Sequence, residues 1–410
     1  MIWLVCRIRK DKTICFLIIY INNLDDESCM KNITNEGIKL KEIQKKYILY
    51  IGWEGNGNIG DDIVFEIFKL LFNKQIRLCH CNFSYVIDTV NTYKADRIEK
   101  YDIVILGGGS LFSMPKYIDI CIEAINSGVK VLTWGTGIDM RYVQKTNIVM
   151  QNFKSGKRSL VMNDLVTNYD YIKKMIEQAH KIAVRGEITR YILDHLKNEL
   201  KIQVIGDPGI VISKLMDENI RLDSVEKSTK NKLIGLNWGT TNNLLLGMNE
   251  RELLLQVSVT VNLLTAMDYK IVLFAMCEED LISCKFLYDF LGNKKVILIK
   301  KVLKVRNMVQ LFSCFKFSIN LKLHANIISM SVGRPFVCLA YGLKCFDFVD
   351  SISLNELILS TEDVVSSKIM ECVRYIEKNY TILCSRMTEK IDLYYQKHIA
   401  YMDEIIRELI

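Results

Sequence analysis

Residues 47–72, YILYIGWEGNGNIGDDIVFEIFKLLF, indicate the class of fold to which this chain belongs. The first five residues are apolar or aromatic and end at Gly52, as expected for a buried strand. From Asp61 to Phe72 apolar residues recur three or four positions apart, which predicts a helix directly after the glycine-rich loop. A strand, a glycine loop and a helix in this order are typical of α/β proteins with parallel strands.

The same alternation continues along the chain. The other apolar runs predict strands over residues 102–106, 130–134, 181–184, 203–205, 233–237, 270–274, 295–299, 317–320 and 335–339. Amphipathic segments predict helices over 116–127, 169–179, 187–200, 250–267, 279–291, 305–314 and 324–332. Because the strand runs are apolar throughout, they predict parallel strands that helices cover on both faces.

The charged stretch 217–232 shows no strong periodicity and divides the alternation into two parts, so it is the predicted linker. The 410 residues suit two domains, since single hydrophobic cores stop growing near about 250–300 residues. We expect an N-terminal extension (1–45), two Rossmann-like domains (46–216 and 233–360) and two C-terminal helices (361–410). Such domains place a site in the cleft between them, at the carboxyl ends of strands.

Composition narrows the class of function. Half the residues are hydrophobic and a quarter are charged, which is typical of a folded soluble protein. The net charge of +7 suits an anionic substrate or peripheral contact with an anionic membrane surface. It is too diffuse to indicate nucleic-acid binding, and no nucleic-acid-binding motif accompanies it. The 13 cysteines lie mostly inside apolar runs, as free thiols do in a reducing compartment, and a cytoplasmic protein is expected.

The N-terminal segment 1–22 is apolar but contains embedded charges. Its longest uncharged run, 13–24, is shorter than the roughly 20 residues that a membrane-spanning helix needs. It also lacks the small-residue cleavage site of a signal peptide. We expect either a hairpin or an extension ahead of a domain that starts near Tyr47.

The loop 52–62 resembles an anion-binding loop, because glycines let backbone N–H groups face a ligand at a helix N-terminus. Gly55, Gly57 and Gly60 match the spacing G-x-G-x-x-G of a dinucleotide fingerprint. The next predicted strand, around residues 75–78, lacks the terminal acidic residue that would hold a ribose, which argues against that interpretation. Asp61 and Asp62 are explained by capping of the helix, with acid–base chemistry as the alternative.

Three further segments follow predicted strands. Gly107-Gly108-Gly109-Ser110 could bind an anion or form a plain tight turn, and Trp134-Gly135-Thr136-Gly137 repeats the arrangement one strand later. Arg185 follows the strand 181–184, where a guanidinium can bind a carboxylate or phosphate or form an ordinary ion pair. The three segments predict groups that converge at one sheet edge.

Lys322-Leu323-His324-Ala325 follows the strand 317–320, at a predicted strand-to-helix junction. Lysine offers a fixed cation there, and histidine can donate or accept a proton near neutral pH. A purely structural role for His324 is the alternative, since a site needs several converging groups.

Cys79-His80-Cys81 invites a metal-binding interpretation, but no second pair at ligand spacing accompanies it. It stands at the end of a predicted strand, 75–80, and we expect these thiols to pack in the structure. No metal and no cofactor is therefore expected.

Taken together, these segments resemble the polysaccharide pyruvyl transferase family. The resemblance rests on an ordered set of motifs between residue 47 and about residue 350: GNIGD at 57–61, GGGS at 107–110, Arg185 with Glu187, Asp207-Pro208, Leu323-His324-Ala325, Gly333-x-Pro335-Phe336 and Tyr341-x-x-Lys344. One position departs from the pattern: Lys322 stands where the family has the arginine of Arg-x-His, so the charge stays but the fork geometry is lost.

The resemblance implies a GT-B-like fold and an enzyme that transfers a pyruvyl group from phosphoenolpyruvate to a sugar of a cell-surface or exopolysaccharide, releasing phosphate. It implies His324, Lys322 and Arg185 as catalytic residues, with His324 as a proton donor. The implied substrate-binding residues are Gly57, Asn58, Gly60, Asp61, Gly108, Gly109, Ser110, Tyr341 and Lys344. The expected partners are phosphoenolpyruvate as donor substrate and a glycan acceptor that carries a lipid in some systems.

Two other functions are compatible with the same residues. A GT-B-like glycosyltransferase would use these cations to hold the diphosphate of a nucleotide sugar. A non-catalytic glycan- or anion-binding protein could keep the scaffold without the chemistry. Acceptor-dependent release of phosphate from phosphoenolpyruvate separates the three.

Overall fold

The computed structural model describes residues 2–10, 13–21, 44–81, 83–93, 95–156, 169–195, 201–216 and 232–410. The predicted linker, 217–232, thus lies outside the described residues except for its last position. The chain forms two compact units. The smaller comprises residues 1–45 and 82–84, and the larger comprises residues 46–81 and 85–410.

The smaller unit contains an antiparallel hairpin of β1 (Ile2–Lys10) and β2 (Thr13–Ile21). Its register runs from Ile2 opposite Ile21 to Lys10 opposite Thr13. The prediction of a hairpin, one of the two alternatives for this segment, is confirmed.

The first sheet of the larger unit has the strand order β4-β3-β5-β6. Its strands are β3 (Gln44–Ile51), β4 (Phe83–Thr89), β5 (Ile103–Leu106) and β6 (Lys130–Thr133). The pairs β3–β5 and β5–β6 are parallel, and parallel bridges link β6 and its following loop to the parallel pair β7 (Ile182–Val184) and β8 (Ile202–Val204). All four residues of β5 are buried, as its unbroken apolar run predicts.

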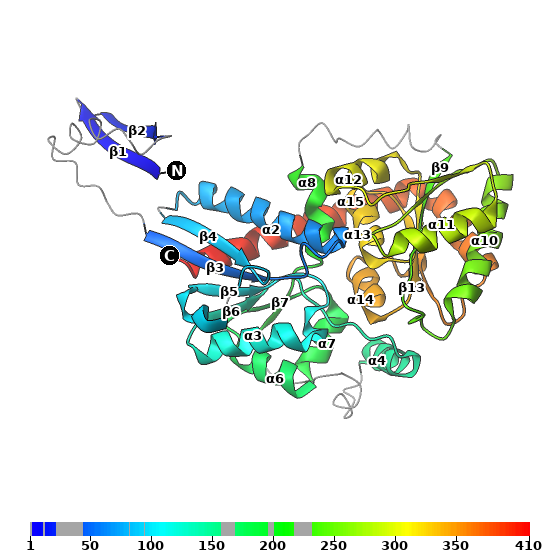
Figure 1. Cartoon of the computed structure of the whole chain (residues 1–410), viewed down its shortest axis with the longest axis horizontal. Helices are drawn as coiled ribbons and strands as arrows, with labels where there is room; N and C mark the ends of the chain where they lie inside the picture. Colours follow the sequence, from blue (N-terminus) through cyan, green and yellow to red (C-terminus); the bar gives the residue numbers. More distant parts are fainter. Residues whose placement is uncertain are drawn as a thin grey trace. The chain divides into compact units, whose positions relative to one another are not determined.

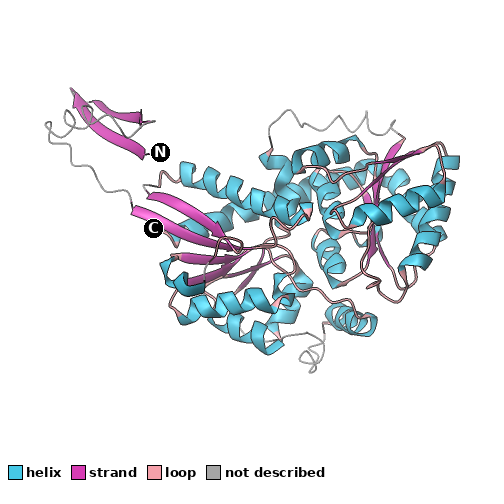
Figure 2. Ribbon diagram, viewed as in Figure 1, coloured by secondary structure: helices cyan, strands magenta, loops and turns pink. Residues whose placement is uncertain are grey.

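Helices flank this sheet, as Figures 1 and 2 show. They are α2 (Ile59–Leu78), α3 (Pro115–Asn126), α6 (Tyr169–Gln178) and α7 (Glu187–Asp194). This part of the chain also contains α4 (Val143–Ser155), which contacts α7, and α8 (Ile212–Leu215), which contacts α2 and α13. Short 3-10 turns lie at Ala95–Lys100, Leu111–Ser113 and Pro208–Val211.

The second sheet is entirely parallel, with the order β11-β10-β9-β12-β13-β14. Its strands are β9 (Leu233–Asn237), β10 (Lys270–Phe274), β11 (Val296–Leu298), β12 (Ser318–Asn320), β13 (Phe336–Ala340) and β14 (Ile358–Ser360). The helices are α10 (Glu250–Ala266), α11 (Asp280–Leu291), α12 (Val305–Cys314), α13 (Leu323–Ser331) and α14 (Leu343–Ser351), with a 3-10 turn at Asn355–Leu357.

The C-terminal helix α15 (Ser366–Arg407) connects the two sheets. It starts against α10, where Thr260 Oγ1 donates to Ser366 Oγ over 3.0 Å, and ends near the first sheet, where Lys130 Nζ lies 2.8 Å from Glu408 Oε2. We predicted two helices here, and the structure agrees in that the backbone is non-helical at Asn379, where a kink divides α15 into two helical segments. Among the described residues, no helix has the length and apolar character to cross a membrane.

The prediction of a strand near residues 75–80 is wrong, because α2 continues through Leu78. Gln75 is buried on the helical face that packs on α15, and its Nε2 donates to Asp403 Oδ1 over 2.7 Å. Cys79 follows the helix and is exposed, so the expectation that it packs is also wrong.

Candidate functional site

A cavity of about 200 Å³ lies where the carboxyl ends of strands from both sheets meet. Loops that follow strands of the first sheet contribute Asn58, Asp61, Gly109, Ser110, Arg141 and Arg185. The second sheet contributes Met276, Cys277, Asp280, Lys322, Leu323, His324, Tyr341 and Lys344. The location is the one expected for open α/β sheets.

The glycine-rich loop joins the two sheets at this cavity. Asn58 caps α2, and its Oδ1 accepts from Gly60 N over 3.0 Å. Ile59 N donates to Met276 O over 3.2 Å, and Asn58 forms a bridge with Cys277. The N-terminal turn of α2 is therefore held against the segment that follows β10.

Gly60 is needed for the approach of His324. A Cβ atom at position 60 would overlap the imidazole ring of His324. Gly57 and Gly108 do not line the cavity. Gly57 adopts φ +74°, a turn conformation that favours glycine, and a Cβ at Gly108 would press against Val64 and Pro208. These three predicted binding residues lie around the site and shape its backbone.

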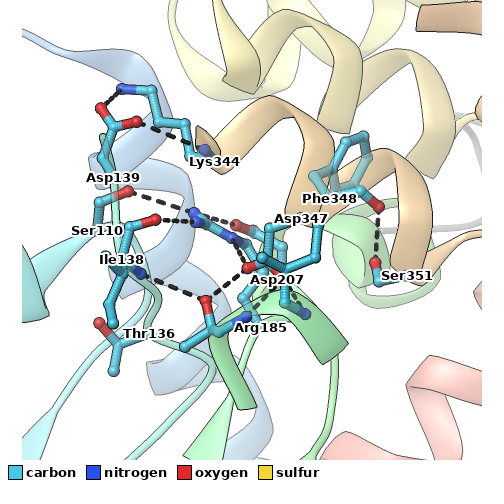
Figure 3. Close-up of polar contacts among 12 residues, drawn as sticks. Ser110, Thr136, Ile138, Asp139, Arg185, Asp207, Lys344, Asp347, Phe348 and Ser351 are labelled. Atoms are coloured by element: carbon cyan, nitrogen blue, oxygen red, sulfur yellow. Dashed lines mark hydrogen bonds and ion pairs between the residues drawn. The ribbon is translucent and has the colours of Figure 1, made fainter. Parts of the chain in front are cut away.

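Arg185 is fully buried and lies between two carboxylates, as Figure 3 shows. Its Nε is 3.4 Å from Asp347 Oδ2, and its Nη1 is 4.0 Å from Asp207 Oδ2. Nη1 also donates to Gly109 O and Ser110 Oγ, over 3.4 and 3.5 Å. These contacts position the guanidinium at the wall of the cavity.

Asp347 ties the middle of α14 to the start of α7. Its Oδ1 accepts from the backbone N–H groups of Ile188 and Thr189, over 3.0 and 3.1 Å. Its Oδ2 accepts from Thr189 Oγ1 over 2.7 Å. A carboxylate at a helix N-terminus satisfies free N–H groups and complements the helix dipole, so Asp347 fixes both α7 and Arg185.

Arg141 and Lys344 share the carboxylate of Asp139. Arg141 Nε lies 3.2 Å and Lys344 Nζ lies 3.1 Å from Asp139 Oδ2. Both cations lie over the ring of Tyr341, with Arg141 Cζ 5.3 Å and Lys344 Nζ 4.8 Å from its centroid. Burial raises the pKa of Asp139, but Lys344 and Arg141 lower that pKa by a larger amount, so the carboxylate stays ionised. Figure 3 shows the Lys344–Asp139 pair.

Lys322 caps the start of α13 and points to Asp280. Its Nζ lies 2.9 Å from Asp280 Oδ1 and donates to Thr240 O over 2.6 Å. Burial lowers the pKa of Lys322, but Asp280, Tyr341 and Cys277 together raise it by more, so the net pKa is raised. Lys322 is therefore a cation with a fixed partner.

Four titratable groups in the cavity have strongly shifted pKa values: those of Lys344, Cys277 and Asp61 are raised, and that of His324 is lowered. Burial, with the nearby cations Lys344, Arg185 and Lys322, lowers the pKa of His324 to about 3. Its Nε2 is buried and has no hydrogen-bond partner among the described residues. Burial raises the pKa of Asp61 to about 7, an effect that Asp207 increases and Lys344 opposes. Near neutral pH the imidazole is therefore neutral and the carboxyl is partly protonated.

Most of the site residues predicted from the sequence meet in this cavity, including Asn58, Asp61, Arg185, His324 and Lys344. The residues that sequence reasoning missed are Arg141, Met276, Cys277 and Asp280. Met276 and Cys277 directly follow the end of β10, a position at which α/β proteins place functional loops. That rule could have found them. Nothing in the sequence singles out Asp280, whose partner is 42 positions away.

The fold resembles that of several enzymes of known structure. S. aureus MnaA in a structure with UDP is 11% identical, with a TM-score of 0.54, covering 85% of this chain and 92% of that one. UDP-GlcNAc 2-epimerase from Neisseria meningitidis is 13% identical, with a TM-score of 0.53 and coverage of 89% and 99%. A UDP-glucosyltransferase from Polygonum tinctorium is 7% identical, with a TM-score of 0.52 and coverage of 90% and 99%. At such identities the likeness concerns the fold, and it confirms the GT-B-like arrangement.

No curated protein sequence matches the chain. The family profile described as polysaccharide pyruvyl transferase matches residues 12–342. This match includes the glycine-rich loop, Arg185 and His324, so it covers most of the cavity described above. The chain belongs to the polysaccharide pyruvyl transferase family, a family of transferases.

Proposed function

We propose that this enzyme transfers a pyruvyl group from phosphoenolpyruvate to two hydroxyls of a sugar in a cell-surface or exopolysaccharide, forming a pyruvate ketal and releasing phosphate. The observation that carries the proposal is a small cavity that combines several cations with a partly protonated carboxyl, in a chain of this family. We propose no cofactor.

The size and charge of the cavity suit this donor. About 200 Å³ is below the roughly 300–1,000 Å³ that is usual for drug-sized ligands, and it suits a three-carbon phosphate ester. Lys344 and Arg141 can face the phosphate and Arg185 the carboxylate, since guanidinium and ammonium groups recognise such anions. Lys322 offers a single cation without a fork, so we assign it a supporting role at the phosphate.

Asp61 is the proposed donor of the proton that the methylene carbon of phosphoenolpyruvate receives. A general acid works best when its pKa lies near the operating pH, and that of Asp61 is about 7. Protonation of this carbon makes its neighbour electrophilic, and the first sugar hydroxyl adds to that neighbour. Arg185 and Lys344 stabilise the charge on the anionic groups as the reaction proceeds.

His324 is the proposed base for the first sugar hydroxyl. It is neutral in the free protein, and an anionic donor would offset the surrounding cations and raise its pKa toward a useful range. The protonated imidazole then gives this proton to the leaving phosphate. The second hydroxyl attacks the resulting oxocarbenium carbon and returns its proton to Asp61, so protons and atoms balance.

The alternative of a glycosyltransferase that uses a nucleotide sugar needs room for a nucleoside diphosphate, for which this cavity is small. A non-catalytic binding protein would not need a carboxyl with a pKa near neutrality. The site therefore favours pyruvyl transfer over both.

The test is phosphate release from phosphoenolpyruvate with the purified chain and a panel of lipid-linked and nucleotide-linked sugars. We expect release only with an acceptor, and loss of release in Asp61→Asn and in His324→Ala. Asp119→Asn, an exposed carboxyl on α3, is the matched control and should keep full activity. Two results would contradict the proposal. One is sugar transfer from a nucleotide sugar without phosphoenolpyruvate. The other is a parent chain that binds the acceptor but shows no turnover, with both site variants binding the acceptor equally well.

A further inference from the structure

The outer faces of α10 and α11 carry two exposed apolar stripes. On α10 these are Leu255, Val259 and Leu263, which are 45–50% exposed. On α11 they are Ile282, Phe286 and Phe290, which are 80, 61 and 52% exposed. Residues four apart lie on one face of a helix, so each set forms a continuous stripe.

The helices that carry the two stripes are neighbours on one face of the second sheet. The helices α10 and α11 connect β9 to β10 and β10 to β11, which are successive parallel neighbours in the second sheet. Parallel crossovers are right-handed, so two consecutive crossovers in one direction place both helices on the same face of the sheet. The two helices are in contact. Large neighbouring apolar surfaces on a soluble protein mark interaction sites.

A basic segment runs along the sheet edge next to α11, through the edge strand β11 to the start of α12, which crosses to the opposite face of the sheet. Residues 294–306, KKVILIKKVLKVR, contain six basic residues and no acidic one. All six side chains are exposed: Lys294, Lys295, Lys300, Lys301, Lys304 and Arg306. In the described part of the chain, Lys300, Lys301, Lys304 and Arg306 form no ion pair, whereas Lys295 pairs with Asp268 at 3.0 Å.

Two of the acidic residues near the stripes form ion pairs: Asp289 pairs with Lys285 on α11, and Asp268 pairs with Lys295. Glu252 on α10 and Glu278 and Glu279 before α11 are exposed and form no ion pair within the described ranges. The segment 294–306 carries five basic residues without an ion-pair partner in that part of the chain, so the balance of unpaired charge beside the stripes is positive.

We propose that α10, α11 and the segment 294–306 form a docking surface for an anionic lipid bilayer. Apolar side chains beside lysines and arginines are the combination that binds the interface of anionic membranes. Basic residues near such a surface add to the affinity one by one. The charge complementarity selects the bilayer as the occupant, because a second copy of the chain would bring an equally basic segment.

The surface is joined to the active cavity through α11. This helix begins at Asp280, which lines the cavity and pairs with Lys322. Docking through α11 would hold the cavity near the plane of the membrane, which suits a lipid-linked acceptor. This consequence rests on the proposed function, whereas the docking surface itself does not.

The test is sedimentation of the full chain with vesicles that contain equal parts of phosphatidylglycerol and phosphatidylcholine. We expect binding at low salt, weaker binding at high salt, and little binding to pure phosphatidylcholine vesicles, since salt screens exposed charges. Phe286→Glu should weaken binding about tenfold or more, because a buried phenyl ring is lost and a charge is added. Lys300→Glu with Lys301→Glu should weaken it at least tenfold.

Matched controls carry the same changes elsewhere. Ile382→Glu replaces an exposed apolar residue of α15, and Lys116→Glu with Lys174→Glu reverses two exposed lysines near the first sheet. Both should bind vesicles as the parent does, and all variants should turn over a soluble acceptor at the parent rate. Equal binding to neutral vesicles, or unchanged binding by both surface variants, would overturn the proposal. So would a dimer that Phe286→Glu separates while vesicle binding stays intact.

Discussion

Replacement of Gly60 by alanine tests how closely the glycine-rich loop approaches the proposed catalytic histidine. The added Cβ would overlap the His324 ring, so the ring or the first turn of α2 must move. Overpacking of this kind costs roughly 1–3 kcal/mol. Alanine recovers roughly 0.5–1 kcal/mol relative to glycine inside a helix, so we expect a net destabilisation of at most about 2.5 kcal/mol.

The effect on turnover should be larger than the effect on stability. A shift of about 1 Å in a catalytic group can cost about a hundredfold in rate. We therefore expect Gly60→Ala to lower kcat/KM for phosphate release by about that factor, while the protein stays folded at 25 °C. Thermal unfolding and an acceptor-dependent phosphate assay measure the two effects on the same preparation.

Two controls separate the causes. Gly128→Ala places alanine at φ +77° with open space around it, so it should cost about 1–2 kcal/mol of stability and no activity. In the His324→Ala background, Gly60→Ala should have almost no further effect, because the clash partner is absent. Turnover of Gly60→Ala within twofold of the parent would show that the glycine-rich loop does not set the position of His324.

Three further changes have defined outcomes. Because Asp61 must be protonated to act and its pKa is about 7, kcat/KM should hold below that pH and fall above it; a basic limb that survives in residual Asp61→Asn activity would contradict the assignment. Lys322→Met leaves the buried Asp280 carboxylate unpaired and should lower the free energy of unfolding by roughly 3–5 kcal/mol, and Asp280→Asn in the same chain should restore part of it in denaturant titrations. Burial lowers the pKa of His398 to about 3, so below about pH 6.5 the imidazole binds a proton in the unfolded chain but not in the folded one, and the free energy of unfolding falls as the pH drops. His398→Phe should flatten this fall in thermal melts at about pH 4–7. An unchanged slope would contradict the role of His398.

Much of the fold could be predicted from the sequence, because buried parallel strands appear as unbroken apolar runs. The helix α12 begins and ends where its periodicity indicates, at Val305 and Cys314. The secondary-structure predictions failed at segments whose conformation depends on contacts with distant parts of the chain. Gln75 lies on the buried face of α2 because Asp403, far along the chain, bonds its amide. The helix α4 buries only Thr146 and Val149, so it gives almost no apolar pattern.

Some residues of the candidate site could likewise be predicted from the sequence, and others could not. His324, Arg185 and Asp61 could be predicted because each stands beside the carboxyl end of a strand or the start of a helix. The carboxylates that hold the cations could not. Asp347 bonds Arg185 across 162 positions, and Lys344 reaches Asp139 across 205. Such pairs become visible only when the two sheets are placed together. The domain boundaries at 216 and 233 stay a prediction.

The most direct test of the central claim is mass analysis of a defined acceptor glycan after incubation with the enzyme and phosphoenolpyruvate. We expect the glycan to gain one carboxyethylidene group across two hydroxyls, with one phosphate released for each group formed. An unmodified glycan across a panel of acceptors, together with glycosyl transfer from a nucleotide sugar by the same preparation, would contradict it.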